Sequence, residues 1–428
     1  MSDGGPSAGP HWLGAWQDRN YRLYAGGVLL AGFGLQMLNT AVLWEVWERT
    51  RSAWDLGLVG LARALPVVLL ALPAGVVVDR VPRHRLLAVT QVGFGLVAAM
   101  LAVASARGAP LWSIYAALVL SGCVRAFNMP ARQSLLPSLV GTRHFQNAVT
   151  WNSAIFQICA IGGPVAAGSV LAATGRTWTV YAAAALGCGI FAVTASLLRP
   201  RVEPRSPTEH MPRGMLAGLE HIVRERTILG AISLDLLAVL FGGATALLPI
   251  YATTILDTDA FGLGLLKSAP YMGALIMAGV MAARPEFRRA GPALVGSVLA
   301  FGMCMVVFGL STSFWLSMGA LLVSGAVDNV SVVIRHVLVQ TRTPDHLRGR
   351  VTAVNSVFIE CSNELGGFES GAVAAWLGPV FSVVSGGVGT LVVTALVAWR
   401  LPELWRLGRI TERPSDVMHS AAEEKSDE

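Results

Sequence analysis

The segment that decides the fold reads Gly75-Val-Val-Val-Asp79-Arg80-Val-Pro82-Arg83-His84-Arg85. It is a short basic loop with a single carboxylate, and long apolar runs flank it at 56–78 and 86–106. A soluble protein has little reason to crowd arginines between two apolar runs, whereas a membrane protein keeps arginines in the loops that stay in the cytoplasm. The segment therefore predicts a membrane protein with a cytoplasmic loop at this point.

The composition agrees with a membrane protein. Of 428 residues, 54% are hydrophobic and only 14% are charged, whereas soluble domains contain about 25% charged residues. All five cysteines fall in apolar runs without metal-ligand spacing, so we expect buried hydrophobes and no metal or cofactor. The net charge of +6 does not indicate a nucleic-acid partner, because the arginines occupy short loops rather than one helical face.

Apolar runs long enough to cross a bilayer, about 20 residues each, repeat along the chain. They form two groups of six, separated by a proline-rich polar stretch. The predicted fold class is thus an all-α polytopic membrane protein with twelve transmembrane helices in two six-helix, pseudo-symmetric bundles. The predicted spans are 22–47, 55–78, 86–106, 110–130, 145–172, 177–198, 228–254, 262–283, 291–310, 314–338, 348–376 and 379–400.

The predicted domains follow from these spans. An N-terminal segment (1–20) precedes the first bundle (21–198), and a linker (199–226) leads to the second bundle (227–400) and a tail (401–428) that we expect to be disordered. Within the linker, 212–226 has apolar residues at helical spacing and predicts an amphipathic helix on the inner membrane surface.

The arginine distribution predicts the orientation. If the N-terminus is cytoplasmic, cytoplasmic segments hold roughly five times as many arginines as outer loops, so both termini should face the cytoplasm. The outer loops would hold only Arg49, Arg51, Arg107 and Arg176, with Lys267 just beyond one of them. We expect a monomer in the cell (inner or plasma) membrane.

The two halves align with a constant shift of 203 residues across about 55 positions without a gap. Polar residues match as well as small ones: Arg132 aligns with Arg335, and Asn152 with Asn355. Chance similarity between Ala/Gly-rich helices does not readily produce such polar matches. The loop 75–85 has a weaker copy at 279–289, in which Ala283 replaces Asp79.

The loop resembles the signature loop of the major facilitator superfamily, except that Pro82 replaces a glycine. Further stretches, including 126–137, 342–351 and 362–366, resemble the enterobactin-exporter-like and macrolide-efflux-like branch. The resemblance implies secondary active export, usually coupled to protons, by alternating access. It also implies a gate in which Asp79 meets the start of the eleventh span near 349–352. The gating residues would be Gly75, Asp79, Arg80, Arg83 and Arg85.

Ionisable residues inside spans are costly and are therefore functional candidates. Arg125 and Asp328 occupy equivalent repeat positions, and the resemblance places both in the central cavity with Asp235 and Glu45. Either they couple a proton to transport, or they form a static ion pair. Glu360 and Glu364 share a helical face, so they need a proton, a cation or an arginine such as Arg63. The proton-coupling or cavity candidates are Asp235, Asp328, Arg125, Glu45, Glu360, Glu364 and Glu369.

Polar residues on expected cavity-lining helices are candidates for substrate binding. Trp44 is among them, although Trp44 and Trp47 fit interfacial anchors better, and the asparagines fit hydrogen bonds between helices. These substrate-binding candidates are Gln36, Asn39, Trp44, Asn128 and Asn363.

The sequence contains no ATP-binding loop and no catalytic constellation, so we predict no enzyme activity. The leading hypothesis is a proton-coupled exporter of a small amphiphilic metabolite such as a siderophore, antibiotic or drug. The expected partners are that small molecule, protons and the lipid bilayer. Two alternatives stay open: an importer or facilitator of the same superfamily, and a membrane receptor or regulator that does not transport.

Overall fold

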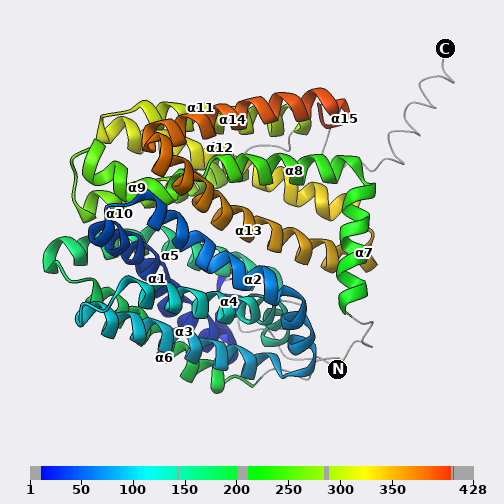
Figure 1. The fold of residues 1–428 in the computed structure, drawn as a ribbon. Coiled ribbons are helices and arrows are strands. Elements are labelled where there is room, and N and C mark those ends of the chain that lie inside the picture. The colour runs from blue at the N-terminus through cyan, green and yellow to red at the C-terminus, as the bar shows by residue number, and fades with distance from the viewer. Residues whose placement is uncertain (1–10, 142–143, 200–210, 284–288, 406–407, 409–428) are drawn as a thin grey trace, which may run out of the picture. The chain divides into compact units, whose positions relative to one another are not determined.

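The computed structural model describes residues 11–141, 144–199, 211–283, 289–405 and 408. These residues form helices and connecting turns and contain no strand. The expected disordered tail beyond Gly408 and most of the proline-rich linker lie outside the described residues. The all-helical class predicted from the sequence is confirmed (Figure 1).

The chain packs into two compact units. The N-terminal unit takes in the described residues up to Glu45 and 65–199, and the C-terminal unit takes in 46–64 and those from 211 onward. Residues 46–64 therefore pack with the C-terminal unit, although they belong to the first predicted bundle in sequence. The first six long helices are α1 (Arg19–Thr50), α2 (Ala53–Arg80), α3 (Arg83–Ala106), α4 (Leu111–Leu139), α5 (Phe145–Thr174) and α6 (Thr177–Ser196), preceded by η1 (His11–Gln17).

The C-terminal unit begins with α7, which corresponds to the predicted amphipathic helix. Its remaining long helices each correspond to a predicted span, except that the first of them is interrupted. The elements are α7 (Met211–Arg224), α8 (Arg226–Phe241), η3 (Ala244–Leu247), α9 (Leu248–Ile250), η4 (Tyr251–Ile255), α10 (Ala260–Ala282), α11 (Ala290–Leu310), α12 (Phe314–Arg342), α13 (Asp345–Leu377), α14 (Pro379–Arg400) and α15 (Pro402–Trp405).

Among the described residues, eleven helical stretches are long and apolar enough to cross a membrane. The 33-residue α13 is not one of them, because it carries arginines at its start and Glu360, Glu364 and Glu369 further along. The chain is thus a multi-pass membrane protein, and the count of twelve spans stays a prediction that depends on α13.

The predicted span over 228–254 is present as the stretch Arg226–Ile255, but its helix is interrupted. The helix α8 ends at Phe241, and a 3-10 turn, a short α-helical turn and a π-helical turn (η4) follow before Leu256. Two glycines stand at the break, and a side chain on Gly243 would overlap the backbone of Gly366 on α13. The break therefore permits close contact between α13 and this segment, which a continuous helix with side chains at these positions would prevent.

The repeat inferred from the sequence recurs in the packing within each unit. A Cβ on Gly163 of α5 would lie 2.5 Å from the Cβ of Gln36 on α1. A Cβ on Gly366 of α13, the repeat partner of Gly163, would lie 2.7 Å from the carbonyl oxygen of Val239 on α8. In both halves, then, the same glycine lets the fifth helix of the half approach the first closely.

The helix α7 buries part of its apolar face against protein. Ile222 is buried in a cluster with Ile228, Val339 and Val351, so α7 packs on α8, α12 and α13 (Figure 1). Leu219 and Val223 are exposed on another part of its surface. Among the described side chains of α7, these two are available for the membrane surface.

Candidate functional site

The centre of the candidate site is an ion pair buried in the C-terminal unit. Asp235 of α8 is 6% exposed, Arg335 of α12 is 2% exposed, and the Arg335 guanidinium contacts the Asp235 carboxylate. The aspartate lies in the apolar segment Leu234–Leu237. A buried pair of this kind is seldom retained for stability alone, since well-packed apolar side chains often do as well.

The sequence analysis missed Arg335, because it counted this residue among the cytoplasmic loop arginines. The structure places it inside the unit instead. The internal repeat could have indicated this position, because Arg132, the repeat counterpart of Arg335, lies on the fourth helix of the first half. Arg132 donates from Nε to the hydroxyl of Tyr24 on α1 at 3.4 Å, so both arginines reach the first helix of their own half. The partner of the arginine is the Asp235 carboxylate in the second half and the Tyr24 phenol in the first half.

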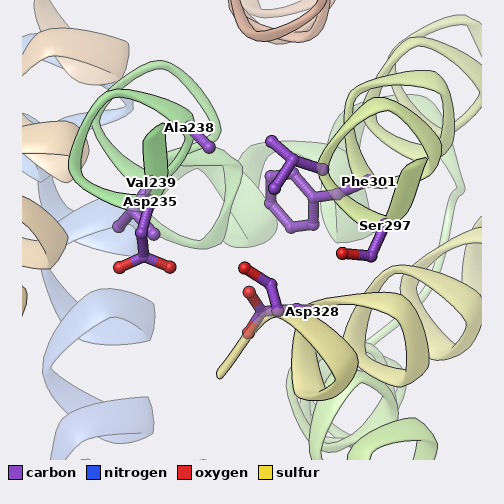
Figure 2. A pocket seen from close by; sticks show the side chains of 8 residues that line it. Asp235, Ala238, Val239, Ser297, Phe301 and Asp328 are labelled. Carbon is purple, nitrogen blue, oxygen red and sulfur yellow. The ribbon is translucent and has the colours of Figure 1, made fainter. Parts of the chain in front are cut away.

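A small cavity adjoins the ion pair. It measures about 10 Å³, and α8, α11 and α12 enclose it. Figure 2 shows the side chains of Asp235, Ser297 and Asp328 converging on this space from three helices, with the ring of Phe301 beside them. The lining residues are Asp235, Ala238, Val239, Ser297, Val298, Phe301, Asp328 and Ser331. The structure therefore brings together two of the predicted coupling carboxylates, Asp235 and Asp328.

A second charged cluster lies elsewhere in the C-terminal unit. Lys267 of α10 lies close enough to Arg63 and Glu364 for their charges to interact. Arg63 belongs to the first half of α2, where a Cβ on Gly60 would lie 2.5 Å from the carbonyl oxygen of Glu364. Arg63 and Glu364 therefore lie close to one another, as the sequence analysis predicted. Lys267 was expected only near the end of a loop, but it joins them from within α10.

The remaining acidic candidates on α13 differ in their surroundings. Glu360 and Glu364 are both half-buried, and Glu369 accepts a hydrogen bond from Ser370 Oγ at 3.4 Å. Asn363, a substrate-binding candidate, is exposed and donates to the carbonyl of Ile359 at 2.8 Å. Together, Lys267, Arg63 and Glu364 bring two basic side chains and one carboxylate close to one another.

The polar candidates in the N-terminal unit are bound within that unit. Glu45 is 3% exposed and accepts a hydrogen bond of 2.7 Å from the hydroxyl of Tyr181 on α6. Asn39 donates to Gln36 at 3.5 Å, and Asn128 donates to Thr90 at 2.8 Å. Arg125 is half-buried. Whether Arg125 and Glu45 share a cavity with Asp235 and Asp328 stays a prediction.

Two tryptophans near the end of α1 have different surroundings. Trp44 is half-buried. Trp47 is 7% exposed, its Nε1 donates to the hydroxyl of Thr253 at 2.7 Å, and the guanidinium of Arg51 lies over its ring. An interfacial anchor needs contact with lipid, so this interpretation is wrong for Trp47.

The signature loop forms the corner between α2 and α3. Gly75 is buried, while Arg80 and Arg85 are exposed as expected of loop arginines. Arg83 donates from Nη1 to the carbonyl of Ser134 on α4 at 3.1 Å. Membrane orientation alone therefore does not explain the arginine at this position. The side chain of Asp79 lies outside the described residues, and its gating role stays a prediction.

Comparison with known proteins decides the family. The sequence profile of the family described as transmembrane secretion effectors matches residues 18–424. This chain belongs to that family of major facilitator transporters. Its curated relatives include the enterobactin exporter EntS of Shigella boydii and of Escherichia coli O139:H28. Each is 26% identical over 385 residues, which cover 89% of this chain and 92% of the relative.

Solved transporters share the fold. A bacterial homologue of the human lysosomal transporter Spinster has a TM-score of 0.71 at 13% identity, covering 90% of this chain and 97% of that one. A mutant of the nucleoside transporter NupG has a TM-score of 0.67 at 13% identity, covering 90% and 100%. The family and the fold make the chain a small-molecule transporter of the enterobactin-exporter-like branch, located in the membrane, rather than an enzyme.

Proposed function

We propose that this transporter is a proton-coupled exporter of a small amphiphilic metabolite, such as a siderophore, an antibiotic or a drug. Export is supported by the relatives named as enterobactin exporters, which match along most of their length. Coupling is supported by one observation above all: the buried Asp235–Arg335 pair lies next to Asp328, beside a small cavity within the C-terminal unit.

The coupling follows from the cost of burying an unpaired charge. While Asp235 is ionised, it neutralises Arg335, and the pair holds α8 against α12. When Asp235 takes up a proton, Arg335 is left as a buried cation without its counter-charge, which is strongly unfavourable. The bundle then gains free energy by rearranging so that Arg335 meets water. If cargo binds only while the Asp235–Arg335 pair is intact, proton uptake releases it, so proton binding and cargo binding exclude one another.

Transport in proteoliposomes tests the proposal. Purified protein is reconstituted, and movement of labelled enterobactin, with erythromycin as a second probe, is measured with and without an imposed pH gradient. The gradient should accelerate movement of a transported probe in the wild type. In Asp235→Asn the acceleration should be lost, because residue 235 can no longer change its charge. The control Glu220→Gln, which alters an exposed pair on α7, should behave like the wild type.

Each result bears on a different part of the proposal. If a probe moves at the same rate with and without the gradient, proton coupling is wrong and a facilitator is favoured. If neither probe moves, the assignment of siderophore or macrolide as cargo is wrong. If the gradient drives accumulation in the direction of import, the exporter assignment is wrong.

A further inference from the structure

The hydroxyl of Ser331 indicates that the cavity beside the ion pair is a binding site. Ser331 is 2% exposed and lines the cavity, and within the described part of the chain its Oγ has no hydrogen-bond partner. A buried hydroxyl without a partner is unfavourable, because it has lost its hydrogen bonds to water. The buried Ser324, on the same helix, avoids this cost by donating to the carbonyl of Leu321 at 2.7 Å. The Ser331 hydroxyl is therefore available to an occupant of the cavity.

The charges around the cavity favour a positive occupant. Asp235 and Asp328 supply two carboxylates, and Arg335 supplies one cation. The helix α11 contributes no charged residue, and His336, next to Arg335 in the sequence, is exposed. With ordinary ionisation the site carries one excess negative charge, and burying such a charge is costly unless a counter-charge joins it.

The size of the cavity limits what that counter-charge can be. About 10 Å³ admits roughly one particle the size of a water molecule. Two carboxylate residues, Asp235 and Asp328, and two hydroxyl residues, Ser297 and Ser331, line this space from three helices. Hard oxygen ligands of this kind suit a small, weakly polarisable cation, and they equally suit a proton shared between carboxylates.

We infer that this cavity binds one monovalent cation, either a proton that passes between Asp328 and Asp235 or a sodium ion, with Ser331 as a further oxygen ligand. The inference deepens the proposed function and rests on it for the role of the ion in transport. Binding of the ion can be measured without any cargo. One cation per site predicts one coupling ion per transport cycle.

Thermal unfolding of the purified full-length protein tests the site, because a ligand that binds only the folded state raises its stability by mass action. Sodium chloride replaces choline chloride at constant ionic strength, and in a separate series the pH is varied without sodium. A sodium site predicts a rise in unfolding temperature with sodium in the wild type. Ser331→Ala should then need about tenfold more sodium for the same rise, since one ligand is lost, and Asp328→Asn should not respond.

A proton site predicts a different pattern. Sodium then has no effect, and infrared difference spectra recorded across the pH series show the band of a protonated carboxylic acid. The contribution of Asp328 to that band, identified as the difference between wild type and Asp328→Asn, should be shifted in Ser331→Ala, because the cavity then lacks the hydroxyl. Ser324→Ala, which removes a buried hydroxyl of the same helix outside the cavity, should match the wild type in both experiments.

The outcomes separate the site from the proposed function. If wild type, Ser331→Ala and Asp328→Asn respond identically to sodium and give identical infrared spectra, the cavity binds no cation and the inference is wrong. If the cation binds but an imposed pH or sodium gradient leaves transport unchanged, the site stands and the coupled-export proposal fails.

Discussion

At the scale of single residues, the Asp235–Arg335 pair shows that burial changes the role of a charged side chain. In the sequence, Arg335 looks like one more cytoplasmic arginine, whereas in the structure it is 2% exposed and bound to Asp235. Removing one member of such a pair leaves the other buried and uncompensated, whereas replacing both leaves no buried charge. Stability and function should therefore respond differently to single and double substitutions.

We expect Arg335→Leu to destabilise the protein by about 3–5 kcal/mol, because Asp235 then lacks its counter-charge. The double variant Asp235→Leu/Arg335→Leu should recover most of that loss but remain unable to couple transport to a gradient. Unfolding temperature in detergent and gradient-driven flux in liposomes measure the two effects. Equal stability of the single and double variants would show that an unpaired Asp235 carries no cost.

Arg83 provides a second prediction, because it is the arginine of the signature loop with a defined partner. Arg83→Ala removes the hydrogen bond to the Ser134 carbonyl and should cost roughly 1–2 kcal/mol, a typical value for a bond with a charged donor. The exposed Arg85 serves as the matched control, and Arg85→Ala should change the unfolding temperature little. If the two variants lose the same stability, the contact with α4 is not what distinguishes Arg83.

At the scale of elements, the C-terminal unit depends on close packing between α10 and α12. A side chain on Gly273 would overlap the carbonyl of Leu322, and one on Gly325 would overlap the backbone of Pro270. These are backbone-to-backbone approaches, which no rotamer change of a neighbour can relieve. Small residues of this kind allow helices in membranes to associate through van der Waals contact.

Gly325→Val should therefore separate α10 from α12 and destabilise the protein by about 1–3 kcal/mol, the usual cost of overpacking. Gly319 lies on the same helix, is exposed and has open space around it, so Gly319→Ala should be neutral or slightly stabilising. Size-exclusion profiles and unfolding temperatures of both variants measure the difference. Normal behaviour of Gly325→Val would contradict the close packing of these two helices.

At the scale of the whole molecule, α13 decides the number of membrane crossings. This helix has the length to span but carries charged residues at several turns. Its partners account for some of that charge: Glu364 lies near Lys267, and Glu369 accepts a bond from Ser370. Charges satisfied within the protein can cross a membrane, because the bilayer does not have to solvate them.

We therefore expect α13 to span, which makes twelve crossings with both termini in the cytoplasm. Fusions ended at Thr343 and at Gly378 test this directly, each carrying either alkaline phosphatase or green fluorescent protein. The fusion at Thr343 should be active only with the fluorescent protein, and the fusion at Gly378 only with the phosphatase. The same activity pattern at both positions would show that α13 does not cross.

The sequence by itself determined the class of the protein, nearly every helix and the family. Apolar runs of bilayer length leave the backbone no alternative to helices, since water is absent there and every amide must bond within its own segment. That constraint is local, so it can be read without knowing which helices are neighbours. The signature loop and its arginines could be recognised in the same way, because a short continuous segment contains them.

Only the tertiary structure decided which of the buried charges meet. Asp235 and Arg335 are a hundred residues apart, Lys267 approaches Arg63 from another helix, and the break after Phe241 follows from the contact of Gly243 with Gly366. Spacing within one helix predicts its faces but not the neighbour that each face packs against. A buried charge is stable only beside the right partner, so the candidate site emerges from packing between helices and not from any one stretch of the sequence.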